Sequence, residues 1–183
     1  MLKTLLILFG FYFFPAVAPT ISKEKIDHLK DFALQQGCND DYAIFIDMSK
    51  PSNEKRWHVV DLSSMKVVFS TYVAHGKGSG EGKQAEVFSD KPGSNCTALG
   101  IYKVTGSFIG EHGLGYSLDG LEETNKNALN RSIVIHSAWY ADDDFITKYD
   151  RCGNSWGCPA ISAQALEACK PYLKPGTLIW IYR

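Results

Sequence analysis

Two neighbouring stretches, RSIVIHSAWY (131–140) and RCGNSWGCPAIS (151–162), hold one histidine and two cysteines. The β-branched, apolar run before His136 predicts a core strand that ends at this histidine. Gly157 removes side-chain bulk just before Cys158, so backbone N–H groups there can converge on a reacting oxygen. A thiol reacts as the thiolate and needs a nearby base. Cys158 is therefore a candidate nucleophile and His136 its candidate base, although a histidine at a strand end is more often structural.

Working outward from this stretch, short β-branched and aromatic runs alternate with Gly, Pro, Asn and Ser. They predict mostly antiparallel strands at 42–47, 57–62, 66–74, 100–106, 132–136 and 177–182. Helical spacing of apolar residues predicts a helix capped by Ser22 and ended by Gly37, and a short second helix after Ser162. We expect a mostly β fold, a β-sandwich or partly open barrel with a few short helices. The long connections are expected to be functional loops at 75–98 and 107–131.

Length, composition and charge restrict the class of protein. The 183 residues, 45% of them hydrophobic, suffice for one globular domain with its own core. The 19 Lys and Arg residues nearly balance the 20 Asp and Glu residues, and no long run of like charge occurs. These features argue against a nucleic-acid partner.

The N-terminus, MLKTLLILFGFYFFPAVAPT (1–20), has the features of a secretory signal. A lysine near the start, an apolar run and the small residues Ala-Val-Ala follow in the expected order. The apolar run is shorter than the roughly 20 residues that span a bilayer, so we expect no membrane span after signal removal. Pro19 follows the predicted cleavage point and disfavours cleavage, which would leave a tethered N-terminus. The predicted division is a signal at 1–20, an N-terminal helix at 21–37 and the main domain at 38–183.

Export would place the five cysteines in a compartment that allows disulfides, and their odd number leaves at least one thiol unpaired. If Cys158 is the free thiol, the other four allow three pairings: Cys38, Cys96, Cys152 and Cys169. The alternative is a bridge between Cys152 and Cys158. That bridge would make the chain a disulfide-stabilised binding domain without a reactive thiol in this loop.

The segments IVIHSAWY and SWGCPAIS together resemble the His … Ser-x-Gly-Cys signature of murein L,D-transpeptidase catalytic domains. The Pro-Ala after the cysteine is similar to a YkuD-like branch of that family. Three upstream segments occur in the same order as in that branch: YVAHGKGSG (72–80), EVFSDKPGSNCTALGIYKV (86–104) and NALNRSIVIH (127–136). The resemblance therefore covers about residues 43–183.

The resemblance implies that Cys158 attacks the carbonyl of the third residue of a peptidoglycan stem peptide and expels the terminal D-alanine. His136 would take the thiol proton. Backbone N–H groups near Trp156, Gly157 and Cys158 would hold the oxyanion, with Ser155 in a supporting role. The thioester would then pass to an amine, with no cofactor or metal. The resemblance also implies an exported protein of the periplasm or cell envelope.

The sequence departs from the wider family at two places near the motif. Ser137 stands where many relatives have Gly, and Pro159 and Ala160 stand where many have Arg. The nearest guanidinium groups in the sequence are those of Arg131 and Arg151. Both are candidates for binding the substrate carboxylate, because a guanidinium can hold a carboxylate with two hydrogen bonds.

Several alternatives stay open. Water in place of the amine would make the chain an L,D-carboxypeptidase or related peptidoglycan hydrolase, and loss of chemistry would leave an envelope module that only binds. The glycine-rich HGKGSGEGK (75–83) lacks the phosphate-loop pattern and is interpreted as a mobile loop at the rim of the site. The scattered histidines have no zinc-ligand spacing. The acyl acceptor and the oligomeric state are not determined by the sequence.

Overall fold

A computed structural model describes residues 21–111 and 113–183, so the predicted signal at 1–20 lies outside the described residues. Within the described residues, no helix is long and apolar enough to cross a bilayer. In chain order the elements are α1 (Lys23–Gln36), β1 (Tyr42–Asp47), β2 (Trp57–Asp61), β3 (Lys66–Thr71), β4 (His75–Gly76), η1 (Lys77–Ser79), β5 (Gly100–Gly110), β6 (Gly113–Gly120), β7 (Val134–Ser137), η2 (Trp139–Ala141), α2 (Asp143–Tyr149), β8 (Asn154–Ser155), β9 (Ala160–Ile161), α3 (Ala163–Cys169) and β10 (Leu178–Tyr182).

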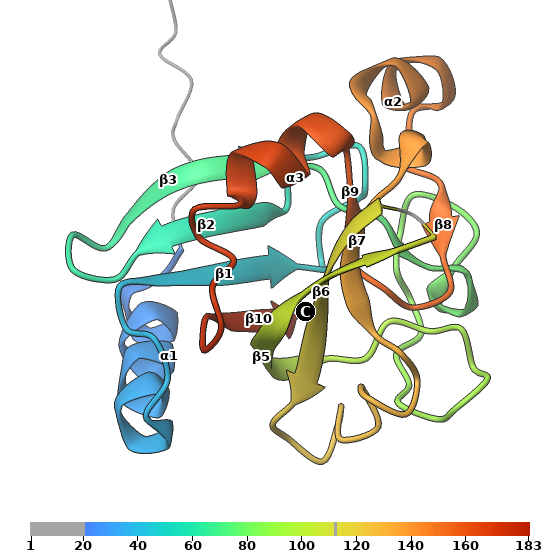
Figure 1. The fold of residues 1–183 in the computed structure, drawn as a ribbon. Coiled ribbons are helices and arrows are strands. Elements are labelled where there is room, and N and C mark those ends of the chain that lie inside the picture. Colours follow the sequence, from blue (N-terminus) through green and yellow to red (C-terminus); the bar gives the residue numbers. More distant parts are fainter. Residues whose placement is uncertain (1–20, 112) are drawn as a thin grey trace, which may run out of the picture.

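Eight strands form one sheet in the order β3-β2-β1-β10-β5-β6-β7-β9, and β4 pairs with β8 in a second, small sheet (Figure 1). The large sheet is open, because β3 and β9 are its edges, and this confirms the predicted mostly β fold without a closed barrel. The pairs β1–β10 and β7–β9 are parallel, and the other pairs of the large sheet are antiparallel. The sheet is therefore mixed.

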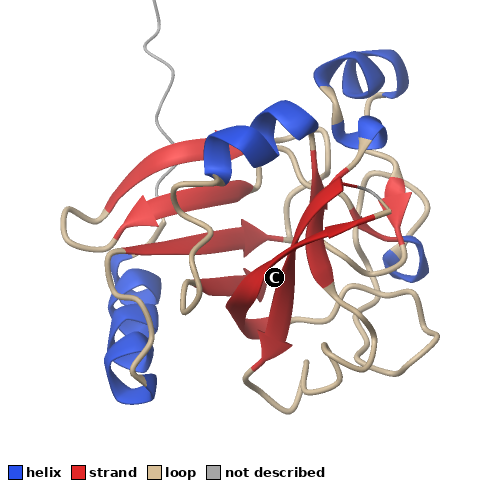
Figure 2. Cartoon of the chain, viewed as in Figure 1, coloured by secondary structure: helices blue, strands red, loops and turns tan. Residues whose placement is uncertain are grey.

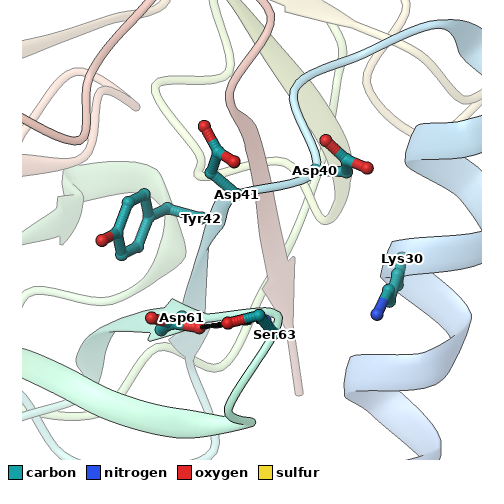
Figure 3. A pocket seen from close by; sticks show the side chains of 6 residues that line it. All are labelled: Lys30, Asp40, Asp41, Tyr42, Asp61 and Ser63. Atoms are coloured by element: carbon teal, nitrogen blue, oxygen red, sulfur yellow. Dashed lines mark hydrogen bonds between the residues drawn. The ribbon is translucent and has the colours of Figure 1, made fainter.

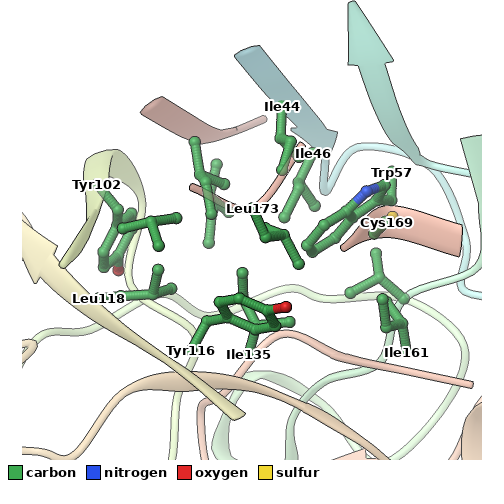
Figure 4. Packing of buried hydrophobic residues seen from close by; sticks show 14 of the residues in the cluster. Ile44, Ile46, Trp57, Tyr102, Tyr116, Leu118, Ile135, Ile161, Cys169 and Leu173 are labelled. Carbon is green, nitrogen blue, oxygen red and sulfur yellow. The ribbon is translucent and has the colours of Figure 1, made fainter. Parts of the chain in front are cut away.

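The two faces of the sheet bury different cores. Along β1 the side chains alternate, so that Ala43 and Phe45 face α1 while Ile44 and Ile46 face the opposite core. The helix α1 begins after Ser22, whose hydroxyl accepts the Lys25 N–H, and ends at a left-handed Gly37, as the sequence predicts. The opposite core lies between the sheet and α3 (Figure 4). Its buried members include Trp57, Tyr102, Leu118, Ile135 and Cys169.

Two predicted connections contain regular structure. The predicted loop at 107–131 holds the end of β5 and all of β6, which pair as a hairpin. Three acidic residues lie at the start of α2: Asp142 is its N-cap residue, and Asp143 and Asp144 are in its first turn. Acidic side chains suit this position because a helix N-terminus carries a partial positive charge. The predicted loop at 75–98 begins with β4 and η1, and 80–99 runs without helix or strand (Figure 2).

Candidate active site

His136 lies on β7, where side chains alternate between the buried core and the opposite side. Ile135 is fully buried in the core, so Val134 and His136 project from the other side of the strand. The Nδ1 atom of His136 lies 3.0 Å from the carbonyl oxygen of Ser137. A carbonyl oxygen only accepts, so Nδ1 carries the proton and the basic lone pair is on Nε2.

Cys158 immediately precedes Pro159 and β9, whose Ala160 is the register partner of His136 in a parallel pair. Cys158 is two residues before Ala160, so the turn that carries it leads directly into the strand paired with His136. The thiol of Cys158 donates to the carbonyl oxygen of Ser132, at 3.6 Å, just before β7. The structure therefore brings the two predicted residues to the same edge of the sheet.

The surroundings of Cys158 act on its pKa in opposite directions. Burial raises the pKa above the ordinary thiol value. The backbone N–H of Val134 and the positive charge of Arg131 both favour the thiolate and partly oppose this rise. The net pKa is raised, so the thiol stays protonated at neutral pH and a base must remove its proton before attack.

All five cysteines are thiols in the structure. Cys152 donates to the carbonyl oxygen of Ser52 at 3.2 Å, whereas Cys158 contacts Ser132, so the alternative Cys152–Cys158 bridge is not formed. Burial raises the pKa of Cys152 to about 11 and that of Cys169 to about 12. These two buried thiols are poor nucleophiles by comparison.

The turn before Cys158 is held by Ser155. The Ser155 hydroxyl donates to the carbonyl oxygen of Cys158 at 2.6 Å and accepts the Gly157 N–H at 3.1 Å. Gly157 has φ +119°, and a Cβ there would lie 2.7 Å from the carbonyl oxygen of Cys96, so the turn requires glycine. Since the Gly157 N–H is committed to Ser155, the N–H of Cys158 itself is the better oxyanion donor. Trp156 projects into solvent and is 79% exposed.

Two hollows of about 330 Å³ each flank β7. One is lined by His136 and by the residues that follow it as far as Tyr140. The other is lined by Ser132, whose carbonyl contacts the Cys158 thiol, and by apolar side chains that include Phe108 and Leu129. The predicted base therefore lines one hollow, and the thiol of the predicted nucleophile contacts a residue that lines the other.

The sequence matches the family model described as L,D-transpeptidase catalytic domain over residues 15–182. The chain belongs to this family. No curated protein gives a significant match.

Solved structures with a similar fold are distant in sequence. Bd1075 of Bdellovibrio bacteriovorus has a TM-score of 0.51 and 16% identity, covering 80% of this chain and 49% of its own. An L,D-transpeptidase from Mycobacterium smegmatis has a TM-score of 0.48 and 11% identity, covering 78% and 59%. An L,D-transpeptidase from Stackebrandtia nassauensis has a TM-score of 0.47 and 12% identity, covering 86% and 64%. This L,D-transpeptidase domain thus spans about half the length of Bd1075, and that likeness supports the fold.

A buried pair of polar side chains, Arg56 and His75, supports the turn before Cys158 in this L,D-transpeptidase domain. The strand β4, with His75, pairs with β8, which ends at Ser155. Arg56 is fully buried and donates to Nδ1 of His75 at 2.9 Å, while Nε2 of His75 donates to the carbonyl oxygen of Gly80 at 2.9 Å. Burial and the Arg56 charge lower the pKa of His75 to about 4, so this ring is neutral. The glycine-rich segment was predicted to be a mobile loop at the rim of the site, but its first residues are packed against the turn before Cys158. No pattern in the sequence predicts that Arg56 is buried beside His75.

Arg131, a predicted substrate ligand, has a side chain only 4% exposed. Its guanidinium forms an ion pair with Asp90 at 3.3 Å and donates to the carbonyl oxygens of Ser89 and Cys96. It therefore fastens the 89–96 segment beneath the catalytic turn, and it acts on Cys158 through its charge.

Arg151, the second predicted substrate ligand, is half-buried. Its guanidinium donates to the carbonyl oxygen of Cys152 at 3.0 Å and to Oδ1 of Asn154 at 3.3 Å. The contacts of Arg151 thus hold the backbone that leads into β8.

A larger hollow of about 480 Å³ lies between α1, β1 and the end of β2, away from the predicted site residues (Figure 3). It is lined by Lys30, Asp40, Asp41, Tyr42, Asp61 and Ser63. The Asp61 carboxylate accepts hydrogen bonds from the hydroxyl and N–H of Ser63, which fixes the turn after β2.

Among the residues that the structure describes, no group of three or more His, Cys, Asp or Glu side chains is placed to hold a metal ion.

Proposed function

We propose that this L,D-transpeptidase domain is an exported cysteine acyltransferase that acts on peptidoglycan stem peptides through a thioester on Cys158. The observation that carries the proposal is the register of β7 and β9, which brings the Cys158 turn beside the strand that holds His136. The hydrogen bond from Nδ1 of His136 to Ser137 supports the role of Nε2 as the base.

In the first half-reaction, Nε2 of His136 accepts the thiol proton, and Sγ of Cys158 forms a bond to the carbonyl carbon of the third stem residue. The backbone N–H of Cys158 donates to the resulting oxyanion. When the tetrahedral intermediate collapses, the C–N bond to the terminal D-alanine breaks and its amine takes the proton from His136. The acyl group remains on Cys158 as a thioester.

In the second half-reaction, the amine of another stem attacks the thioester carbonyl. The C–N bond forms, the C–S bond breaks, and His136 passes a proton from the incoming amine to the Cys158 sulfur. The hollow lined by His136 supports this step, since an acceptor amine bound there would lie beside the base. We assign the predicted substrate arginines a positioning role, because Arg131 and Arg151 both donate to backbone carbonyls.

The proposed location is the cell envelope, where peptidoglycan lies. It rests on the family, whose members act on this polymer, and on the predicted signal at 1–20.

The test is to incubate the purified protein with tetrapeptide muropeptides and to resolve the products by mass spectrometry. We expect cross-linked dimers with the parent and with Cys38→Ala, a matched control that removes a half-exposed thiol elsewhere. Cys158→Ala should give no product. Tripeptides without dimers would mean that water, and not an amine, resolves the thioester, so the protein would be a hydrolase. Product formation by Cys158→Ala would overturn the assignment of the nucleophile.

A further inference from the structure

The hollow at His136 is the first of three neighbouring hollows. Its lining includes Asp142 and Ala163, and both residues also line a neighbouring hollow of about 410 Å³. This second hollow is polar, since its other linings are carboxylate, hydroxyl and amide side chains: Asp143, Asp144, Ser162 and Gln164. Because they share these two residues, the two hollows are neighbours on the protein surface.

A third hollow lies at the edge strand β3. Asp143, Ser162 and Gln164 also line this hollow, which has a volume of about 230 Å³. Its far wall holds two half-buried aromatic side chains, Phe69 and Tyr72. The three neighbouring hollows follow one another from His136, past the start of α2 and α3, to β3, and together we call them the groove.

The end of the groove near His136 carries an aromatic ring that is fixed but open. Trp139 is 72% exposed, although large apolar side chains are usually buried. The ring of Tyr140 contacts it edge-on with centroids 5.8 Å apart, and the ring of Phe145 does so at 5.4 Å. These contacts hold the indole in place before any ligand binds, which reduces the entropy lost on binding.

The groove thus has aromatic side chains at both ends and hydrogen-bonding groups between them. At the β3 end, the ammonium of Lys55 also lines the groove and lies 5.9 Å from the centroid of the Tyr72 ring. A pyranose sugar has the same two characters, because its C–H bonds form an apolar face and its hydroxyl groups form a polar edge. Sugar C–H groups are attracted to the negative face of an aromatic ring, and hydroxyl groups donate to carboxylates. The three aspartates at 142–144 would repel nucleic acid or an anionic membrane. The groove therefore suits a linear, uncharged sugar polymer better than either of these.

We propose that this groove binds a glycan strand of N-acetylated pyranose sugars, with one sugar stacked on Trp139. The inference rests on the proposed function in one respect, namely that the strand is the one that carries the stem peptide to Cys158. The glycan would then run from the catalytic centre toward β3, and the stem would turn from it toward the thiol.

The test uses a peptide-free probe, the tetramer of β-1,4-linked N-acetylglucosamine, titrated into the isotope-labelled protein and followed by NMR. We expect saturable shifts of the Trp139 indole N–H and of backbone amides at 142–144 and 162–164. Trp139→Ala should weaken binding at least tenfold. Gln164→Ala, a change on the protein surface, should weaken it several-fold, and it keeps the test valid if Trp139→Ala fails to fold.

Leu34→Ala is the matched control, because Leu34 is 61% exposed on α1, outside the groove. It should bind the tetramer as the parent does. Absence of saturable binding to the parent, or unchanged affinity in both Trp139→Ala and Gln164→Ala, would overturn the proposal. Cys158→Ala separates the two proposals, since it should bind the tetramer normally although it turns over no stem peptide. Normal turnover of stem peptides without binding of the tetramer would refute glycan binding in the groove and leave the proposed function intact.

Discussion

Acid should destabilise this protein through two buried histidines, His75 and His58. Burial lowers the pKa of each ring to about 4, from an ordinary value near 6.5. The charge of Arg56 adds to this effect at His75, and that of Lys50 adds to it at His58. Both rings are therefore neutral in the folded protein at pH 5, whereas in the unfolded chain both are protonated.

The magnitude follows from proton linkage. Between pH 6.5 and 4 the unfolded chain binds one more proton per histidine than the folded protein, so the free energy of unfolding decreases as the pH falls. The slope is about 1.4 kcal/mol per pH unit for each ring, or about 3.4 kcal/mol over the whole interval. The two rings together give about 7 kcal/mol, which is comparable with the total stability of an ordinary domain. The stabilisation is complete above pH 6.5 and is lost as the pH approaches 4.

The assay is urea unfolding at pH 7.5, 6.5, 5.5 and 4.5, for the parent and for His75→Asn. Asparagine does not titrate, and its carboxamide oxygen can accept from Arg56 in place of Nδ1, so the slope should fall by about half. His28→Asn, a change of an exposed histidine on α1, should keep the parent slope. A parent slope below about 0.5 kcal/mol per pH unit between pH 6.5 and 4.5 would refute the reasoning, given the 1.4 expected from one ring alone.

Three further changes probe the catalytic turn. Gly157→Ala puts a Cβ 2.7 Å from the Cys96 carbonyl oxygen at φ +119°, so it should cost at least about 2 kcal/mol in thermal unfolding and abolish turnover; parent-like activity would contradict it. Ser155→Ala removes two hydrogen bonds, so it should cost about 1–3 kcal/mol and lower kcat more than it changes KM, which steady-state kinetics would reveal. Arg131→Met leaves the Asp90 carboxylate without its ion-pair partner and should lower the free energy of unfolding in urea by about 3–5 kcal/mol. If the double variant with Asp90→Asn recovers none of this stability, the loss does not come from the unpaired carboxylate.

Local sequence patterns predicted most of the strands and helices, because the residues that form these elements have a high intrinsic propensity for strand or helix. β1 occupies the residues predicted for it, since YAIFID is a β-branched and aromatic run between polar turns. β6 was missed because GLGYSLDG has three glycines, and its place in the sheet comes from pairing with β5 and β7. The pairing with β5 is a local hairpin, but glycine has little strand propensity, so the β6 residues themselves carry no strand pattern.

The candidate site shows a similar division. The motif around His136 and Cys158 predicted two segments that the structure brings together, and their catalytic roles remain predictions for the experiments above. The groups that act directly on the thiol include the Ser132 carbonyl and the Val134 N–H. Backbone groups of this kind have no signature in a sequence, because every residue has them. The burial of Arg131 was not predicted either, since its partner Asp90 is distant along the chain.

The pairing of β1 with β10 has a consequence for how the protein forms. Ala43 pairs with Leu178, so two of the central strands of the sheet are made at widely separated times during synthesis. Contacts of such long sequence separation slow folding, because the loop between them must close before they form. The growing chain therefore lacks the centre of its sheet until β10 has been synthesised. Since β10 lies between β1 and β5, the two halves of the sheet can join only at the end of synthesis.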